Sequence, residues 1–262
     1  MKKFSLLVAA VAAMVFASCG NKTAANQGNG DSISFEQSQI EEKIMVELDS
    51  IIDQWHKLGP VDGIFANGKI QLSEDEMKVK PNYLLPATIA DDMSLLSQKY
   101  RAMGMLVVDK KVASLYKMDT DGYTAAITKI ATDVNDNALQ EAANGDMNDA
   151  KAFYLAEKEA GRINFFWETS AAGLIETFYI LSQNQDKFLQ AFDDQTASDM
   201  TYHIAVLKLA LDDLATYDAN IKGLVDILAP LNELNAISVE QLREQVGKMR
   251  PQIEKARGEM LK

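Results

Sequence analysis

From residue 34 to residue 260, apolar side chains recur every three or four positions in nearly every segment of the chain. In the first segment, Ile44, Leu48, Ile51 and Trp55 follow this spacing, with acidic residues between them. This is the repeat of an amphipathic α-helix, because residues three and four apart lie on one helix face. A chain patterned in this way is expected to fold by packing helices together, so we predict an all-α protein.

Turn and cap signals divide this pattern into separate helices. Gly59-Pro60 ends the first helix, and Pro230 follows a later one. We expect helices over about 34–57, 86–118, 123–142, 149–183, 196–217, 219–229 and 238–260. Pro251 lies inside the last helix, where a kink is expected on the exposed side. The pattern favours an antiparallel bundle of about six to eight helices, several of them long, and leaves a helical-repeat solenoid open.

The helix expected over 149–183 has the most apolar composition. Its main seam includes Trp167, Leu174 and Phe178, and from Trp167 to Ile180 it is apolar on nearly all sides. We therefore predict that it lies at the centre of the fold. The aromatic run Phe165-Phe166-Trp167 would also permit an apolar ligand pocket, although core packing accounts for it without one.

Residues 60–80 depart from the helical pattern. An Asn-Gly dipeptide between two short apolar arms is a strong hairpin signal, and the connection is longer than most. We expect a short β-hairpin or an irregular insertion here, serving either as a structural cap or as a recognition loop. For a recognition loop, the binding residues would be Phe65, Asn67, Gly68 and Lys69.

The first nineteen residues have the features of an export signal. Lys2-Lys3 precedes an apolar run from Phe4 to Phe16, and small residues then lead to Cys19. This run is too short to span a bilayer, but its length, charge and small-residue end are typical of a cleaved secretory signal. Cys19 is the only cysteine in the 262 residues, so the folded protein can contain no internal disulfide.

The segment Phe16-Ala17-Ser18-Cys19-Gly20 resembles the lipobox of bacterial lipoproteins, and Ser18-Cys19-Gly20-Asn21 is most similar to lipoproteins of the Bacteroidetes. The resemblance implies that residues 1–18 are a signal peptide cut before Cys19, whose thiol receives the lipid. Residues 19–33, rich in Asn, Gly and Ala, would form a flexible tether to a single helical domain over 34–262. Residues 20–24 contain no acid, which by the same resemblance favours an outer-membrane location facing the periplasm.

The charge balance restricts the possible partners. The chain has 26 Lys and Arg residues against 38 Asp and Glu residues, a net charge of −12 at pH 7, and removal of Lys2-Lys3 makes it more acidic. Nucleic acid is excluded as an expected partner, because its binding requires basic residues that neutralise phosphates. Membrane attachment would rest on the lipid of Cys19, because an acidic surface repels anionic head groups.

Helix bundles can bind metal ions between their helices. Asp53 and His56 lie three residues apart, and Asp199 and His203 lie four apart, so each pair could present two ligands on one helix face. A di-iron bundle would need Glu-x-x-His motifs, which the sequence lacks. We interpret both pairs as exposed surface groups and predict neither a metal site nor a cofactor.

Catalytic motifs are also missing from the sequence. It has no nucleophile elbow, phosphate-binding loop or dinucleotide fingerprint, which leaves carboxylates as possible catalytic groups. The best placed are Glu168 and Glu176, with Asn164 nearby, but eight residues of helix separate the two acids by about 12 Å. A buried glutamate would need a basic partner. The candidates for that partner are Arg162, Arg101, Lys110 and Lys111.

Two functional hypotheses follow. The first is a lipid-anchored, non-enzymatic binding or scaffold protein of the cell envelope, which contacts another protein or a small ligand through a bundle groove, through residues near Asn164 and Glu168, or through the 60–80 segment. The alternative is an envelope hydrolase that uses acidic residues near Glu168 on a glycan or on peptidoglycan. The absence of a recognisable nucleophile, metal set or nucleotide loop from the sequence favours the first hypothesis.

Overall fold

The computed structural model describes residues 35–65, 68–137, 139–140 and 150–262, with side chains from Glu42 onward. Within these ranges the protein is helical, with eleven α-helices, three 3₁₀ turns and no β-strand. The all-α prediction is confirmed. The predicted signal peptide, Cys19, the tether and Asn67 lie outside the described residues.

Most of the predicted helices are present close to their expected positions. The longer helices are α2 (Phe35–Lys57), α5 (Leu96–Leu115), α6 (Asp121–Asp133), α8 (Ala150–Glu159), α9 (Ile163–Gln183), α11 (Asp194–Leu214), α12 (Ala219–Leu228) and α13 (Val239–Met260). The short helices are α3 (Glu74–Lys78), α4 (Ile89–Asp92) and α10 (Gln185–Phe188), and the 3₁₀ turns are Gly63–Phe65, Leu189–Ala191 and Ala229–Glu233.

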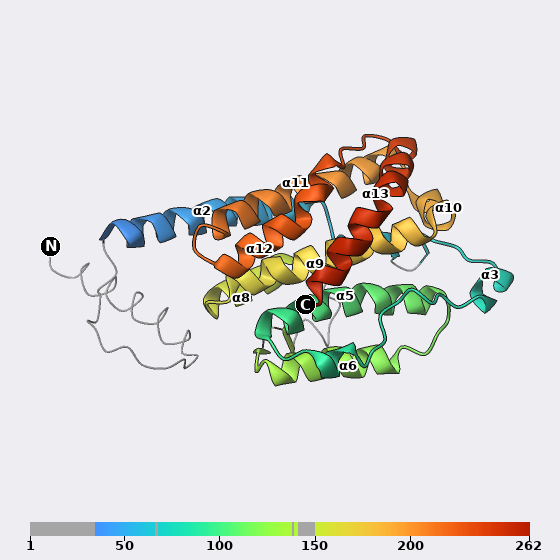
Figure 1. Cartoon of the computed structure of the whole chain (residues 1–262), viewed down its shortest axis with the longest axis horizontal. Helices are drawn as coiled ribbons and strands as arrows, with labels where there is room; N and C mark the ends of the chain where they lie inside the picture. The colour runs from blue at the N-terminus through green and yellow to red at the C-terminus, as the bar shows by residue number, and fades with distance from the viewer. Residues whose placement is uncertain (1–34, 66–67, 138, 141–149) are drawn as a thin grey trace.

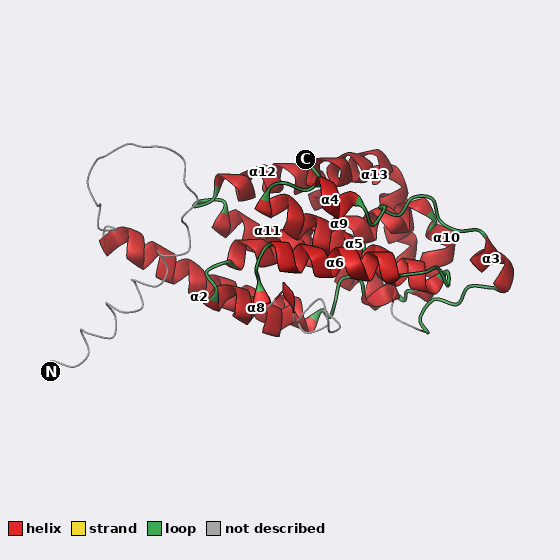
Figure 2. Ribbon diagram, turned by 90° about the horizontal axis from the view of Figure 1, so that it is seen from below, coloured by secondary structure: helices red, strands yellow, loops and turns green. Residues whose placement is uncertain are grey.

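Helix α9 lies at the centre of the molecule, as its apolar composition predicts (Figure 1). It packs against α5 on one side, with α6 beyond α5, and against α8, α11 and α12 on the other, while α13 crosses it. Helix α2 contacts both α8 and α11. The views in Figures 1 and 2 place the start of α2 and helix α3 at opposite ends of the molecule. In the part of the chain that the structure describes, no helix has the length and apolar character needed to cross a membrane.

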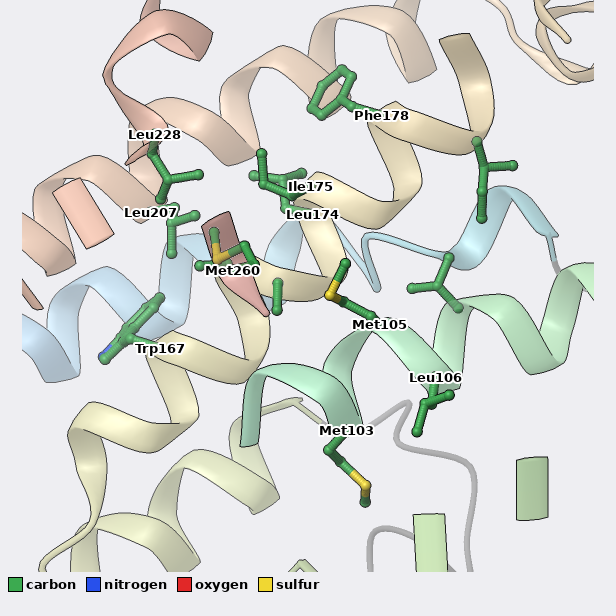
Figure 3. Close-up of a cluster of buried hydrophobic side chains, with 14 of the residues drawn as sticks. Met103, Met105, Leu106, Trp167, Leu174, Ile175, Phe178, Leu207, Leu228 and Met260 are labelled. Carbon is green, nitrogen blue, oxygen red and sulfur yellow. The ribbon is translucent and has the colours of Figure 1, made fainter. Parts of the chain in front are cut away.

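The core is built around Trp167, which has no exposed surface. Its ring meets those of Trp55, Tyr154 and Phe166 edge to face, with centroids 5.8, 6.1 and 5.0 Å away. Figure 3 shows Trp167 in line with Leu174 on α9, beside side chains from α5, α11, α12 and α13. The core therefore joins helices from both halves of the sequence.

The segment expected as one helix over 149–183 is two helices, so that prediction is wrong. Gly161 lies between them with φ of +69°, a conformation that glycine adopts without steric cost. The N–H of Arg162 donates to the carbonyl of Glu157 at 2.7 Å, and the N–H of Gly161 donates to that of Lys158 at 3.2 Å. This pair of bonds is the Schellman motif that ends many helices.

The helix expected over 86–118 is also interrupted. Helix α4 ends at Asp92 and α5 begins at Leu96. The side-chain oxygen of Gln98 accepts hydrogen bonds from the N–H groups of Ser94 and Leu95, at 3.2 and 3.0 Å. Because these groups are satisfied by a side chain, the backbone can leave the helical path there.

Of the two forms expected for the 60–80 segment, the β-hairpin is wrong and the irregular insertion is present, because its described residues form turns, a 3₁₀ turn and helix α3. Ile64 and Phe65 are adjacent in sequence and both are buried in the core, whereas successive residues of a strand point to opposite faces. Ile70, on the other side of the tip, is buried as well. The apolar arms therefore fix the segment to the core instead of pairing with each other.

Candidate functional site

The residues predicted for a recognition loop have different environments. Phe65 is only 2% exposed, and its ring meets Phe188 edge to face at 5.5 Å, so it anchors the segment. Gly68 and Lys69 are exposed, and Gly68 has φ of +89° with no atom near the position that a Cβ would take. Asn67 lies outside the described residues. Only Gly68 and Lys69 therefore present a described surface to a partner.

Glu168, the leading acidic candidate, is completely buried on α9. Its Oε2 accepts a hydrogen bond from Nε of Arg101 on α5, at 2.7 Å, so the predicted need for a basic partner is confirmed with Arg101. Burial raises the pKa of Glu168, and Arg101 opposes this rise. Asn164 does not join this ion pair. Its Nδ2 donates to Oδ2 of Asp218 at 3.3 Å.

Glu176 is also completely buried, but its partner is Arg257 on α13, which the sequence analysis missed. Nε and Nη2 of Arg257 donate to the two carboxylate oxygens at 2.7 and 2.8 Å, the two-point geometry in which an arginine binds a carboxylate most strongly. The guanidinium lies 3.9 Å from the centre of the Tyr179 ring and also donates to the carbonyl of Tyr83 at 3.2 Å. Arg257 thus fixes the last helix to α9.

A second buried acid, Asp109 of α5, lies beside this ion pair. Its Oδ2 accepts a hydrogen bond from the N–H of Leu85 at 2.8 Å, while no donor group of the described residues reaches its Oδ1. Burial and the negative charge of Glu176 raise the pKa of Asp109 well above its usual range. Asp109 and Glu176 therefore share a single arginine.

A similar cluster lies where α8 ends. Nη1 of Arg162 is 3.1 Å from Oδ2 of Asp136, which also accepts a hydrogen bond from the hydroxyl of Tyr100. Burial raises the pKa of Asp136, but its hydrogen bonds more than offset this, so the pKa lies below its usual value. Burial and the charge of Asp136 raise the pKa of neighbouring Glu157 to about 9. Among the described residues, no donor group reaches either carboxyl oxygen of Glu157.

The two histidines differ in exposure. His56 and Asp53 are exposed as expected, and Asp53 pairs with Lys151. The interpretation of His203 as a surface group is wrong, because it is 2% exposed and its ring nitrogens lie 2.9 and 3.1 Å from the carbonyls of Asp199 and Gly59. Burial lowers the pKa of His203. Over the described ranges, no group of three or more potential ligands could hold a metal ion.

An apolar hollow lies between α9, α11 and α12. It encloses about 20 Å³, enough for one water molecule and too little for a larger ligand. Its lining residues include Leu174, Leu207, Leu211 and Leu228.

These sites share a chemical character. Glu168 and Glu176 each bind an arginine, and burial raises the pKa of both acids and of the neighbouring Asp109. None of the three carboxyl groups has exposed surface. A raised pKa would suit a general acid, but a general acid must reach the substrate atom that it protonates. The arrangement therefore supports folding and docking of helices.

Part of this network could have been found from the sequence. Glu157 lies four residues after Phe153 and three after Tyr154, and Asp109 lies three after Leu106, so both acids occupy apolar faces. The arginine partners carry no such signal, because Arg101 and Arg257 lie 67 and 81 residues from the glutamates that they bind.

Comparisons with protein-family models, with curated proteins and with solved structures found no match to this chain.

Proposed function

We propose that this protein is a lipid-anchored, non-enzymatic component of a bacterial cell envelope, and that its helical domain binds another protein or a small ligand. Acylation of Cys19 would attach the domain to the outer membrane, facing the periplasm. The proposal includes an antiparallel packing of the long helices, which would provide a rigid body at the end of the tether.

The observation that carries the non-enzymatic part is the burial of Glu168 and Glu176. Each has no exposed surface and is bound to an arginine from another helix. A glycan chain approaching from solvent could contact neither carboxyl group, whereas hydrolysis needs an acid beside the scissile bond. These contacts support a structural role for the two acids and weaken the hydrolase alternative.

The exposed tip around Gly68 and Lys69 is the proposed contact for a partner. The buried side chains of Phe65 and Ile70 hold this tip on both sides, so it would be presented without the cost of ordering a free loop. The segment leads to α3, at the opposite end of the molecule from the start of α2 (Figures 1 and 2). With the lipid attached before α2, this end would be available to a partner away from the anchor.

The anchor is tested by replacing the acylated atom. Cys19→Ser should abolish incorporation of a labelled fatty acid and shift the protein from the membrane fraction or leave an uncut precursor, because the proposal assigns all membrane affinity to that lipid. Ser18→Ala, which retains the thiol, is the matched control and should still be labelled. Label in the Cys19→Ser variant, or none in the wild type, would contradict the lipid anchor.

The non-enzymatic role is tested separately, by incubating the purified full chain with peptidoglycan and measuring released soluble fragments. The proposal predicts no release above that of a heat-unfolded sample. Release that disappears in Glu168→Gln, while the variant keeps the wild-type helical spectrum, would favour the hydrolase alternative.

A further inference from the structure

Three helices and one connection meet at the buried pair Asp109 and Glu176. The pair joins α5 to α9, and Arg257 adds α13. The connection between α3 and α4 is held at both backbone groups of Leu85, whose N–H donates to Asp109 at 2.8 Å and whose carbonyl accepts from the hydroxyl of Tyr123 at 2.8 Å. The carbonyl of Tyr83 in the same connection accepts from Arg257. The position of α13 and of this connection thus depends on one cluster of charged groups.

The cluster has one more acid than it has bases. The ionisable groups around Asp109 come from every element packed against it: Glu176 and Tyr179 from α9, Arg257 from α13, Tyr123 from α6, Tyr83 from the connection and Tyr116 from the end of α5. Arg250 and Glu254 of α13 lie farther out, beside Tyr179. Among the described residues, the cation that acts on the pair is Arg257, which donates to Glu176.

The hydrogen bonds indicate which acid is ionised. Glu176 receives two donors from Arg257, which stabilise a carboxylate. Asp109 receives one backbone donor, and its Oδ1 is completely buried without a partner. A second unpaired negative charge in this position would cost several kcal/mol, whereas a carboxylic acid could donate its proton to Glu176.

We propose that Asp109 and Glu176 share one proton in the folded protein, and that loss of this proton loosens the docking of α13 and of the connection around Leu85. The strength with which the C-terminal helix α13 packs against the core would then depend on pH through this pair. This role is independent of the proposed function, because it requires neither a lipid anchor nor a partner.

The direction of the pH dependence follows from the raised pKa of Asp109. In the unfolded chain, an aspartate releases its proton near pH 4, while the folded pair keeps it to a higher pH. Stability from this pair is therefore complete below pH 4 and falls as pH rises toward the folded pKa. The unfolding equilibrium constant should rise about tenfold per pH unit for this one proton.

The test compares the full chain with Asp109→Asn, in mild detergent, by urea unfolding between pH 7 and pH 8.5, and the difference between the two slopes removes the titration of groups that both proteins share. The side-chain oxygen of an asparagine can accept the hydrogen bond from the N–H of Leu85, and its NH₂ group can donate to Glu176, but it has no proton that titrates. The unfolding equilibrium constant of the variant should therefore rise less steeply with pH than that of the wild type, by about a factor of ten per pH unit. Its remaining slope should include the contribution of Glu157, which is unchanged. Asp226→Asn, at an exposed position of α12, is the control and should keep the wild-type slope.

Amide hydrogen exchange of the wild type tests the same proposal without a variant. After correction for intrinsic exchange rates, protection of α13 and residues 79–88 should fall between pH 7 and pH 8.5, while α2 and α11 remain protected. Equal slopes for the wild type and Asp109→Asn would overturn the proposal. If the variant does not fold, pH-independent protection of α13 in the wild type would overturn it.

Discussion

At the scale of single residues, the number of donors decides whether a buried acid is ionised. Asp136 accepts hydrogen bonds from Tyr100 and the N–H of Leu139 and is paired with Arg162, so its pKa lies below its usual value. Glu157, equally inaccessible, accepts no hydrogen bond from a donor group in the described part of the chain, and burial and the charge of Asp136 raise its pKa to about 9. At neutral pH, Asp136 is therefore negatively charged, whereas the neighbouring Glu157 is neutral.

Glu157→Gln should make stability less dependent on pH. The raised pKa means that the stability associated with Glu157 is complete below about pH 4 and falls as pH rises toward 9. A glutamine keeps the shape of the side chain and holds no titrating proton. In urea unfolding from pH 5 to pH 8, the wild-type free energy of unfolding should fall with pH. In Glu157→Gln this fall should be smaller by about 1.4 kcal/mol per pH unit. Glu159→Gln, an exposed neighbour, should keep the wild-type decline, and an identical decline in Glu157→Gln would contradict the assignment.

At the level of helices, α5 and α9 lie in close contact at Gly104. A Cβ at this position would lie 2.3 Å from the carbonyl oxygen of Thr169, a contact that backbone atoms do not tolerate. On the facing helix, a Cβ added at Gly173 would lie 3.5 Å from the carbonyl oxygen of Gly104. This approach brings the Arg101–Glu168 pair and the Asp109–Glu176 pair within reach of both helices.

Gly104→Ala should therefore separate α5 from α9. We expect a loss of about 2–3 kcal/mol in the free energy of unfolding, since the added methyl group meets backbone atoms that cannot move independently. Gly258→Ala, on α13 with no atom within 4 Å of the added Cβ, is the matched helical control. It should be neutral or gain up to about 1 kcal/mol, because alanine favours the helix. Equal urea midpoints for the two variants would show that the helices are not in close contact.

The same scale shows what the sequence could predict. Apolar spacing identified α2, α11, α12 and α13 and the central position of α9, because it records which helix face is buried. It could not locate the break at Gly161, because a single glycine is compatible with a continuous helix or with a Schellman end. The hairpin prediction used only the turn signal of Asn67-Gly68, whereas tertiary burial of Ile64 and Phe65 determined the backbone.

Across the whole molecule, buried acids lie beside arginines that come from other helices or connections. The chain is acidic overall, yet its most buried carboxyl groups are gathered around single arginines. Those arginines come from distant parts of the sequence, so local patterns placed Glu168 and Glu176 on an apolar helix but could not identify both of their partners. These acids therefore serve the fold by binding arginines and retaining protons.

The most direct test of this claim is to count the protons released when the full chain unfolds at pH 7.5. The count comes from calorimetric unfolding in buffers with different ionisation enthalpies. We expect net release of about two protons, from the Asp109–Glu176 pair and from Glu157, because these groups ionise on reaching water. The double variant Asp109→Asn/Glu157→Gln should release about two fewer. Unfolding of the wild type without net proton release, or with the same release in the double variant, would contradict the claim.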